Sequence, residues 1–182
     1  MISYQTLKKI LFKFEPETAH NLAEYGLRIV GKCKIAKAYM EKKNYISNPK
    51  LTQEIFGVRF ENPVGLAAGF DKNATMIKSM KSLGFGFTEI GTMTPKPQDG
   101  NPKPRMFRYP EQKSVQNAMG FNNKGAHEVL KNLKKVYPFS IPVGANIGKN
   151  KFTPEEFALS DYKSLIKKFE ASSDYLVINI SS

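Results

Sequence analysis

From residue 51 onward, short apolar runs alternate along the chain with longer segments whose apolar residues recur every three or four positions. Runs of this kind, rich in small and β-branched residues, are typical of strands buried within a sheet. The longer segments have the spacing of helices that bury one face. We therefore expect strands at 63–69, 87–94, 141–148 and 175–181, and helices at 74–84, 124–136 and 154–172.

The ends of the expected helices carry residues that favour helix ends. Gly84 closes the first helix, lysines lie near the end of the second, and Pro154 followed by acidic residues begins the third. Alternation of strand and helix predicts βαβ units on a parallel sheet, and therefore an α/β fold. Segment 51–62 is predicted to form a separate small hairpin that turns at Gly57.

Residues 1–43 are predicted to form a pair of helices that precedes the α/β region at 44–182. The first helix, over 7–14, has apolar residues on one face and lysines on the other, and the second covers 18–30. A basic and apolar pair of this kind could pack on the main core, or it could lie on a membrane surface as interfacial helices do. The sequence leaves both possibilities open.

The amino-acid composition limits the kinds of ligand and binding site that the chain is expected to have. The chain carries 28 Lys and Arg against 16 Asp and Glu, a formal net charge of +12, which suits a nucleic acid, an anionic membrane, a phosphorylated ligand or simply a solvated lysine surface. The single cysteine, Cys33, excludes a disulfide framework, and with only His20 and His127 no metal site is expected. No run approaches the ~18 apolar residues of a transmembrane helix, and lysines interrupt any signal-peptide core.

The residues that end or follow the four expected strands are small or polar, and include Lys72, Thr92, Asn146, Lys149, Ser181 and Ser182. In parallel α/β folds ligands bind at the carboxyl ends of the strands, so this set predicts a binding site there. Ordinary turn chemistry, which also favours Gly and Asn, is the alternative. Neither a G-x-G-x-x-G nor a G-x-x-x-x-G-K-[ST] pattern occurs, which disfavours a Rossmann dinucleotide site and a P-loop.

Five longer motifs occur in one order along the chain: NPVGLAAGFDKNA, GFGFTEIGTMTPKPQDGNPKPRMFR, NAMGFNNKG, ANIGKNK and NISS. Together they resemble the membrane-associated, quinone-dependent class of dihydroorotate dehydrogenase, and the resemblance covers essentially the whole chain. It implies an FMN enzyme on a (β/α)8 TIM barrel, of which about the first four βα units are present here. The implied reaction oxidises (S)-dihydroorotate to orotate in de novo pyrimidine (UMP) biosynthesis and passes the electrons to a membrane quinone.

The resemblance also implies roles for single residues. FMN would be held by Ala68, Gly69, Phe70, Asp71, Lys72, Thr92, Asn146 and Asn179. The substrate would contact Lys72, Asn179 and a hairpin formed by Asn117, Ala118, Met119, Gly120 and Phe121. Ser182 falls where this class places its catalytic base, and His20 and Arg108 match positions near its quinone tunnel. A structural histidine is the alternative for His20, and binding of the FMN phosphate is the alternative for Arg108.

The chemistry of these side chains agrees with the implied roles. A pyrimidine ring presents amide-like donors and acceptors, and an Asn side chain offers both. Serine is a weak base, so geometry and a neighbouring proton acceptor must provide much of its effect. Lys72 could balance negative charge on a reduced flavin or on a carboxylate. The related soluble class carries cysteine where Ser182 stands, and the one cysteine of this chain lies far upstream, which favours the quinone-linked class.

At 182 residues the chain is shorter than the ~250 residues typical of this barrel, and it has four of the eight expected strands. We therefore expect the N-terminal half of the enzyme, with uncovered strand edges that make the chain alone bind FMN poorly and aggregate or dimerise. The intact enzyme is expected to be a monomer that binds no nucleic acid. It is expected to lie peripherally on the cytoplasmic face of the inner membrane through residues 1–43.

Two other functions fit part of the sequence. Another flavin barrel, acting on dihydropyrimidines or on dihydrouridine in tRNA, would share the fold, but the catalytic cysteine of such enzymes is missing and they do not resemble this chain in NISS after ANIGKNK. A basic module that binds RNA or anionic lipid without catalysis would use the charge alone, with steeply salt-dependent binding. The lysines are spread over helices rather than interleaved with aromatic residues, which disfavours RNA binding.

Overall fold

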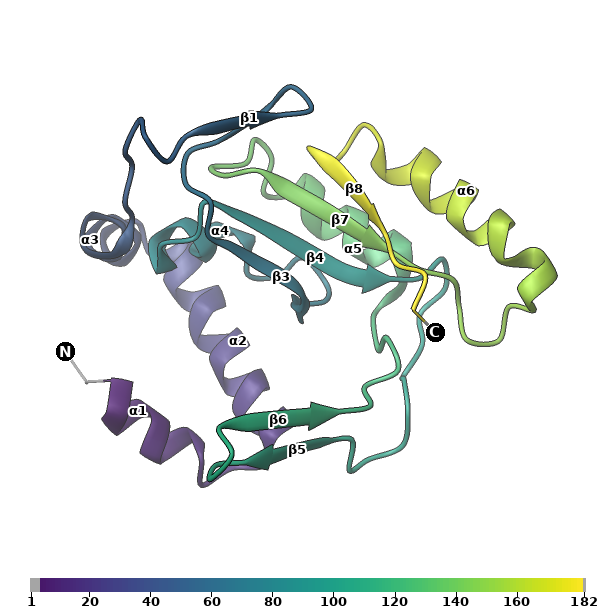
Figure 1. Ribbon diagram of the computed structural model, residues 1–182, viewed down its shortest axis with the longest axis horizontal. Coiled ribbons are helices and arrows are strands. Elements are labelled where there is room, and N and C mark those ends of the chain that lie inside the picture. The colour runs from purple at the N-terminus through teal and green to yellow at the C-terminus, as the bar shows by residue number, and fades with distance from the viewer. Residues whose placement is uncertain (1–3, 182) are drawn as a thin grey trace.

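The computed structural model describes residues 4–181, and its centre is a four-stranded parallel sheet. The strands are β3 (Gly65–Asp71), β4 (Phe87–Met93), β7 (Val143–Ile147) and β8 (Tyr175–Ile178), and they pair in that order (Figure 1). All four predicted strands are confirmed. Because consecutive parallel strands are neighbours here, their carboxyl ends meet at one edge of the sheet.

Helices cover one face of this sheet, and in Figure 1 α4 and α5 lie behind it. α4 (Ile77–Met80) continues into the short helix η1 (Lys81–Leu83), α5 (Gly125–Lys134) precedes β7, and α6 (Ala158–Phe169) follows η2 (Glu155–Phe157). Their apolar sides and the outward side chains of the strands form one core, with fully buried members that include Ile90, Leu133, Ile147, Leu165 and Phe169. Among the described residues the other, inner face carries no helix. The predicted α/β fold is thus confirmed, and the arrangement fits part of a (β/α)8 barrel.

The predicted small hairpin covers the amino-terminal end of the inner face. It is confirmed as β1 (Gln53–Ile55) paired antiparallel with β2 (Val58–Phe60). The Phe60 ring packs edge-on against Phe87, with centroids 5.3 Å apart, and its centroid lies 6.0 Å from that of Tyr175. Since Phe87 begins β4 and Tyr175 begins β8, the three rings close the end of the sheet opposite to the predicted site.

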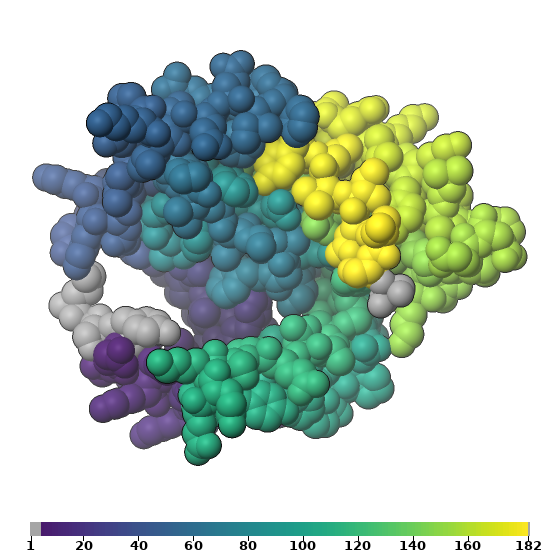
Figure 2. Space-filling model, in the orientation of Figure 1, coloured from purple at the N-terminus to yellow at the C-terminus, as the bar shows by residue number. Residues whose placement is uncertain are grey.

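A second hairpin pairs β5 (Met106–Tyr109) with β6 (Ser114–Asn117). The expectation of a hairpin at 117–121 is therefore wrong, because 118–121 form a loop that follows β6. No sequence signal predicted β5 and β6, since both strands are short and largely exposed and lack a buried apolar alternation. Figure 2 shows this hairpin set apart from the sheet by a hollow.

Three helices rather than the predicted pair precede the sheet within the described residues. They are α1 (Tyr4–Leu11), α2 (Pro16–Lys32) and α3 (Lys34–Asn44). Cys33 separates α2 from α3 with an extended backbone, φ −93° and ψ 104°. One residue of extended backbone is too small a break to be seen in the spacing of apolar residues, which is why the third helix was not predicted.

The apolar side of α2 faces away from the core. Leu22, Tyr25 and Ile29 are 46%, 66% and 52% exposed, whereas Leu27 of the same helix packs against the core cluster of Met76, Met80 and Ile141, so packing on the core and contact with a membrane both remain open for this pair. On α1, Leu7 and Ile10 are similarly exposed. None of the helices between residues 4 and 181 is both long and apolar enough to span a membrane. The N-terminal helices therefore present a row of apolar side chains that nothing in the described chain covers.

Two arginines, one just before β5 and one within it, bind the N-terminal helical region. The Arg105 guanidinium donates to Glu17 of α2 from Nε at 3.1 Å and from Nη2 at 2.8 Å, and the two side chains are only 8% and 14% exposed. Nη1 of Arg108 donates to the Phe14 carbonyl at 2.9 Å, and its guanidinium lies 4.7 Å from the centre of the Phe12 ring. The hydrogen bond from Arg105 is the main cause that lowers the pKa of Glu17, although burial opposes it.

Gly86 lies where two backbone segments meet, and a larger residue does not fit there. A Cβ atom would be 2.2 Å from the backbone oxygen of Asn62 and 2.6 Å from its Oδ1. Gly86→Ala is expected to lower the free energy of unfolding of the native protein by about 1–3 kcal/mol in urea titrations. The matched control is Gly26→Ala within α2, where no atom lies within 4 Å of the added Cβ, and it should raise stability by about 0.5–1 kcal/mol. Equal losses in both variants would contradict this contact.

The bond between Glu17 and Arg105 makes stability depend on pH. The pKa of Glu17 in the folded protein is lowered from its ordinary value of 4.5, so folding favours the ionised carboxylate. This stabilisation is present above the ordinary pKa and is lost as pH falls through the lower, folded-state pKa. Glu17→Gln should lower the free energy of unfolding by about 2 kcal/mol at pH 7, and the difference from wild type should shrink in acid. A difference that stays constant across the acid range would refute this linkage.

Candidate active site

Three polar side chains at the carboxyl ends of neighbouring strands form one hydrogen-bonded group. Thr92 lies in β4, Asn146 in β7, and Asn179 directly follows β8. The Thr92 hydroxyl donates to Oδ1 of Asn146 at 2.6 Å and accepts from Nδ2 of Asn179 at 2.9 Å. The parallel register sets Gly91 opposite Asn146, which brings the next residue, Thr92, within reach. The structure thus unites three residues that the resemblance assigned to FMN, and their role stays a prediction.

Bonds around this group decide which amide atoms are left for a ligand. Because Thr92 engages Oδ1 of Asn146, Nδ2 of Asn146 remains as a donor among the described residues. Oδ1 of Asn179 accepts from the Ser181 N–H at 3.0 Å and from the Ser181 hydroxyl at 2.5 Å. Tyr162 of α6 donates to the Asn179 carbonyl at 2.8 Å. The group therefore holds N–H donors in place at the sheet edge, where they suit a ring with carbonyl or ring-nitrogen acceptors.

The end of β3 is open toward the inner face. Ala68 lies between two exposed small residues, Ala67 and Gly69. Gly69 has φ +103°, and no atom lies within 4 Å of a Cβ added to it. The Phe70 side chain packs away from this opening, with its ring 4.8 Å from that of His20. Small side chains and free space leave the main chain of this strand end accessible to a flat ligand.

Asp71, also assigned to FMN by the resemblance, uses its side chain to hold the turn into α4. One carboxylate oxygen accepts from the Thr75 N–H and the other from the Met76 N–H, each at 2.8 Å. Burial raises the pKa of Asp71, and these backbone bonds oppose the rise. Only the main chain of Asp71 is therefore left to face a ligand.

Lys72 and His20 line a small cavity between β3 and α2, of about 80 Å³, together with Glu17 and Glu24. Burial is the main cause that lowers the pKa of both residues. The positive charge of Lys72 lowers the pKa of His20 further, which favours the neutral imidazole. Arg108 does not line this cavity, so the structure does not bring the two quinone-site candidates together in it.

The segment assigned to the substrate, which is the last residue of β6 and the loop after it and is called loop 117–121 below, forms one wall of a larger cavity of about 620 Å³. Lys149, Tyr162 and Ser181 line it as well. Both Tyr162 and Ser181 are bonded to Asn179, so the cavity adjoins the hydrogen-bonded group at the strand ends. Its volume suits a small molecule, with room for more than one ring.

Two residues that sequence reasoning missed support this wall. Nε2 of Gln98 donates to the Gly120 carbonyl at 3.0 Å, and Nδ2 of Asn101 donates to the Ala118 carbonyl at 2.9 Å. Both act on the backbone of a loop that is distant in sequence. No periodicity or local chemistry marks such residues, so only the fold reveals them.

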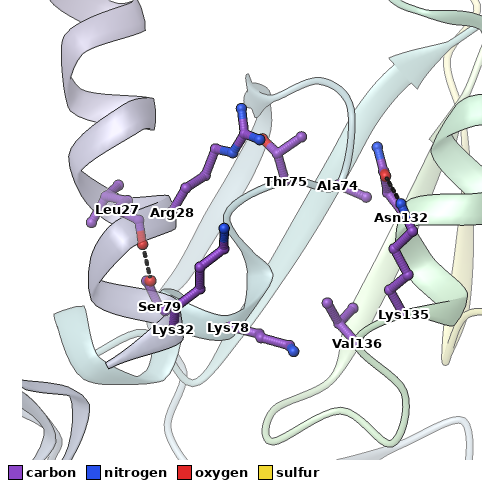
Figure 3. Close-up of a pocket in the computed structure, with 11 residues that line it drawn as sticks. Leu27, Arg28, Lys32, Ala74, Thr75, Lys78, Ser79, Asn132, Lys135 and Val136 are labelled. Atoms are coloured by element: carbon purple, nitrogen blue, oxygen red, sulfur yellow. Dashed lines mark hydrogen bonds between the residues drawn. The ribbon is translucent and has the colours of Figure 1, made fainter. Parts of the chain in front are cut away.

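Another cavity lies on the helix-covered side, away from the strand ends. It has a volume of about 320 Å³ and lies between α2, α4 and the end of α5. Figure 3 shows Arg28 and Lys32 of α2 facing Lys135 across it, with Lys78 between them. None of these cations forms an ion pair within residues 4–181. Part of the basic surface noted in the sequence is thus gathered here rather than at the predicted site.

Ser182, the predicted catalytic base, lies outside the described residues. Its neighbour Ser181 is described and reaches the Asn179 amide. Among residues 4–181, no group of three or more His, Cys, Asp or Glu side chains could hold a metal ion.

Comparison with known proteins identifies the family. The family model of dihydroorotate dehydrogenase matches residues 50–182. The dihydroorotate dehydrogenase (quinone) of Sulfurimonas denitrificans is 60% identical over 182 residues, which are 100% of this chain and 52% of that protein. The protein of the same name from Nitratiruptor sp. is 56% identical over 181 residues, again 100% of this chain and 52% of that protein. The chain spans about half the length of these curated relatives.

Solved structures give the same result. The crystal structure of DHODH from Eimeria tenella in complex with ferulenol has a TM-score of 0.77 at 40% identity, and the match covers 92% of this chain and 44% of that one. The ligand-free form has a TM-score of 0.75 at 39% identity, over 92% of this chain and 46% of that one. Since the family model matches most of the chain and quinone-linked relatives match all of it, the chain belongs to the dihydroorotate dehydrogenase family.

Proposed function

We propose that this chain forms the first part of the active site of a quinone-linked dihydroorotate dehydrogenase, which oxidises (S)-dihydroorotate to orotate with FMN in pyrimidine biosynthesis. The observation that carries the proposal is the bonded group of Thr92, Asn146 and Asn179 beside a cavity of about 620 Å³. Ligands of parallel α/β folds bind at this edge of the sheet. The reaction is inferred from the names of the relatives, and the carboxyl ends of the strands are where its ligands would bind.

The strand ends fit FMN. The N–H donors of Asn146 and Asn179 suit the oxygen and nitrogen acceptors of a flavin ring. Open space at Gly69 would let the flat ring approach the main chain of β3. Lys72 would place a cation beside the ring, where negative charge develops. When bound, FMN would accept the hydride that leaves C6 of the substrate.

The substrate would lie between the flavin and the loop 117–121. Within that loop, the Asn117 side chain accepts from the Met119 N–H at 3.4 Å, which leaves its amide N–H groups to bind a carbonyl or carboxylate. Asn179 would bind the same ring from the sheet side. Ser182 would take the proton from C5, an assignment that rests on the resemblance and needs a proton acceptor beyond the serine.

We propose further that residues 1–43 rest on the cytoplasmic face of the inner membrane and admit the quinone. The exposed apolar side chains of α1 and α2, with basic residues on the same helices, are typical of interfacial helices. His20 lies on α2 where this helix faces Phe70 of β3, and burial lowers its pKa, which favours the neutral imidazole. Arg108 would line the approach from the side of the β5–β6 hairpin.

Anaerobic reduction of the flavin tests the proposed reaction. Dihydroorotate added to the native protein should bleach the visible flavin absorbance, and a quinone should restore it. A flavin band that ignores dihydroorotate would refute the substrate and favour another flavin enzyme of the same fold. Absence of any flavin would refute the cofactor.

Thr92→Val tests the bonded group, because valine keeps the shape and removes the hydroxyl that orients both amides. It should weaken FMN binding about tenfold, the equivalent of one or two hydrogen bonds, as measured by flavin release on dilution. Thr88→Val is the matched control on the same strand, because the Thr88 hydroxyl is buried without a hydrogen-bond partner among the described residues. The control should retain FMN and stability, and equal FMN loss in both variants would refute the role of Thr92.

A further inference from the structure

Arg105 lies where three segments distant in sequence meet. Its Nη1 donates to the carbonyls of Asp99 at 2.6 Å and Asn101 at 2.8 Å. Its own carbonyl accepts from the Ala118 N–H at 2.8 Å. Its Nε and Nη2 bind Glu17 of α2 at 3.1 Å and 2.8 Å. Because a guanidinium holds five N–H donors in one rigid plane, this single side chain fixes a loop and a helix together.

The segment that Arg105 shapes is seated closely against loop 117–121. The Asn101 N–H donates to the Met119 carbonyl at 3.1 Å. At Gly100, which has φ +81°, a Cβ would be 2.1 Å from that same carbonyl and 2.8 Å from Nη1 of Arg105. This contact leaves no room for one segment to move alone. A shift of the Arg105 guanidinium would therefore displace the loop.

The other side of Arg105 is tied to the N-terminal helices. Glu17 lies in the first turn of α2, and its bond to Arg105 is largely shielded from water, with 14% and 8% of the two side chains exposed. Breaking such a pair leaves a charge without its partner in a poorly hydrated place, so the pair resists separation. When α2 moves, Arg105 therefore moves with it, because the bond between Glu17 and Arg105 stays intact.

We propose that Arg105 is a positioning residue through which the placement of α2 sets the conformation of loop 117–121. The identity of the two ligands rests on the proposed function, with orotate or dihydroorotate at the loop and a quinone at the N-terminal helices. A ligand that moves α2 then changes the affinity of the loop for its own ligand. By thermodynamic reciprocity, the ligand at the loop changes the affinity for the quinone by the same factor.

Hydrogen exchange of the native protein tests the positioning without any ligand. Glu17→Gln keeps the size of the side chain and removes its charge. The N–H groups of Asn101 and Ala118, which are bonded across the contact, should exchange at least about fivefold faster relative to those of β7. The matched control is Glu24→Gln, which also removes a negative charge from α2, but at a carboxylate that accepts from the Thr75 hydroxyl at 2.8 Å rather than from Arg105. Unchanged exchange in Glu17→Gln, or equal acceleration in the control, would overturn the proposal.

Calorimetric titration with orotate tests the coupling. Oxidised holoenzyme, orotate and a saturating short-chain quinone do not react with one another, so binding is measured without turnover. In wild type the quinone should change the Kd of orotate on the order of fivefold. In Glu17→Gln the change should fall below about twofold, and Arg105→Lys should be intermediate, because an ammonium keeps the charge without the planar set of donors.

The outcomes separate this inference from the proposed function. An equal quinone effect in wild type and Glu17→Gln would overturn the coupling while orotate binding stands. Wild-type protein that binds no orotate would refute the proposed function instead. In that case the exchange of the Asn101 and Ala118 amides would still decide whether Arg105 positions the loop.

Discussion

Parallel pairing of β3, β4, β7 and β8 is the constraint on which the rest of the structure depends. It brings Thr92 and Asn146, which are 54 residues apart in the chain, within 2.6 Å of each other. The same pairing turns alternate side chains toward α4, α5 and α6, where they form the core. The sheet therefore stabilises the domain through its outer face and gathers polar groups at its carboxyl edge. The core on the outer face and the polar group at the carboxyl edge both follow from the same strand register.

The parts of the fold that could be predicted are those with a local signal. The four strands are apolar runs, and the helices after them have regular spacing and marked ends, so both follow from neighbouring residues alone. β5 and β6 have no such signal, because they are held by each other and by contacts to α2 rather than by burial of an apolar face. The break at Cys33 is a matter of one backbone conformation, which spacing does not record.

The candidate site, too, could be predicted only in part. That Thr92, Asn146 and Asn179 gather at one edge follows from strand order, but their mutual hydrogen bonds depend on side-chain geometry. Asp71 shows the limit, because it lies in a motif assigned to FMN and its carboxylate is used by the turn into α4. Arg105 could not be singled out at all, since a buried arginine and a surface arginine look alike in a sequence.

The ring cluster of Phe60, Phe87 and Tyr175 closes the amino-terminal end of the same strands whose opposite end carries the amides. The ring contacts join only residues of the first end, and the hydrogen bonds of Thr92 join only residues of the second. Substitutions in the ring cluster would therefore be selected for their effect on folding, and substitutions at the carboxyl edge for their effect on ligand binding and catalysis. A scaffold divided in this way can exchange one reaction for another while its closed end remains as it was.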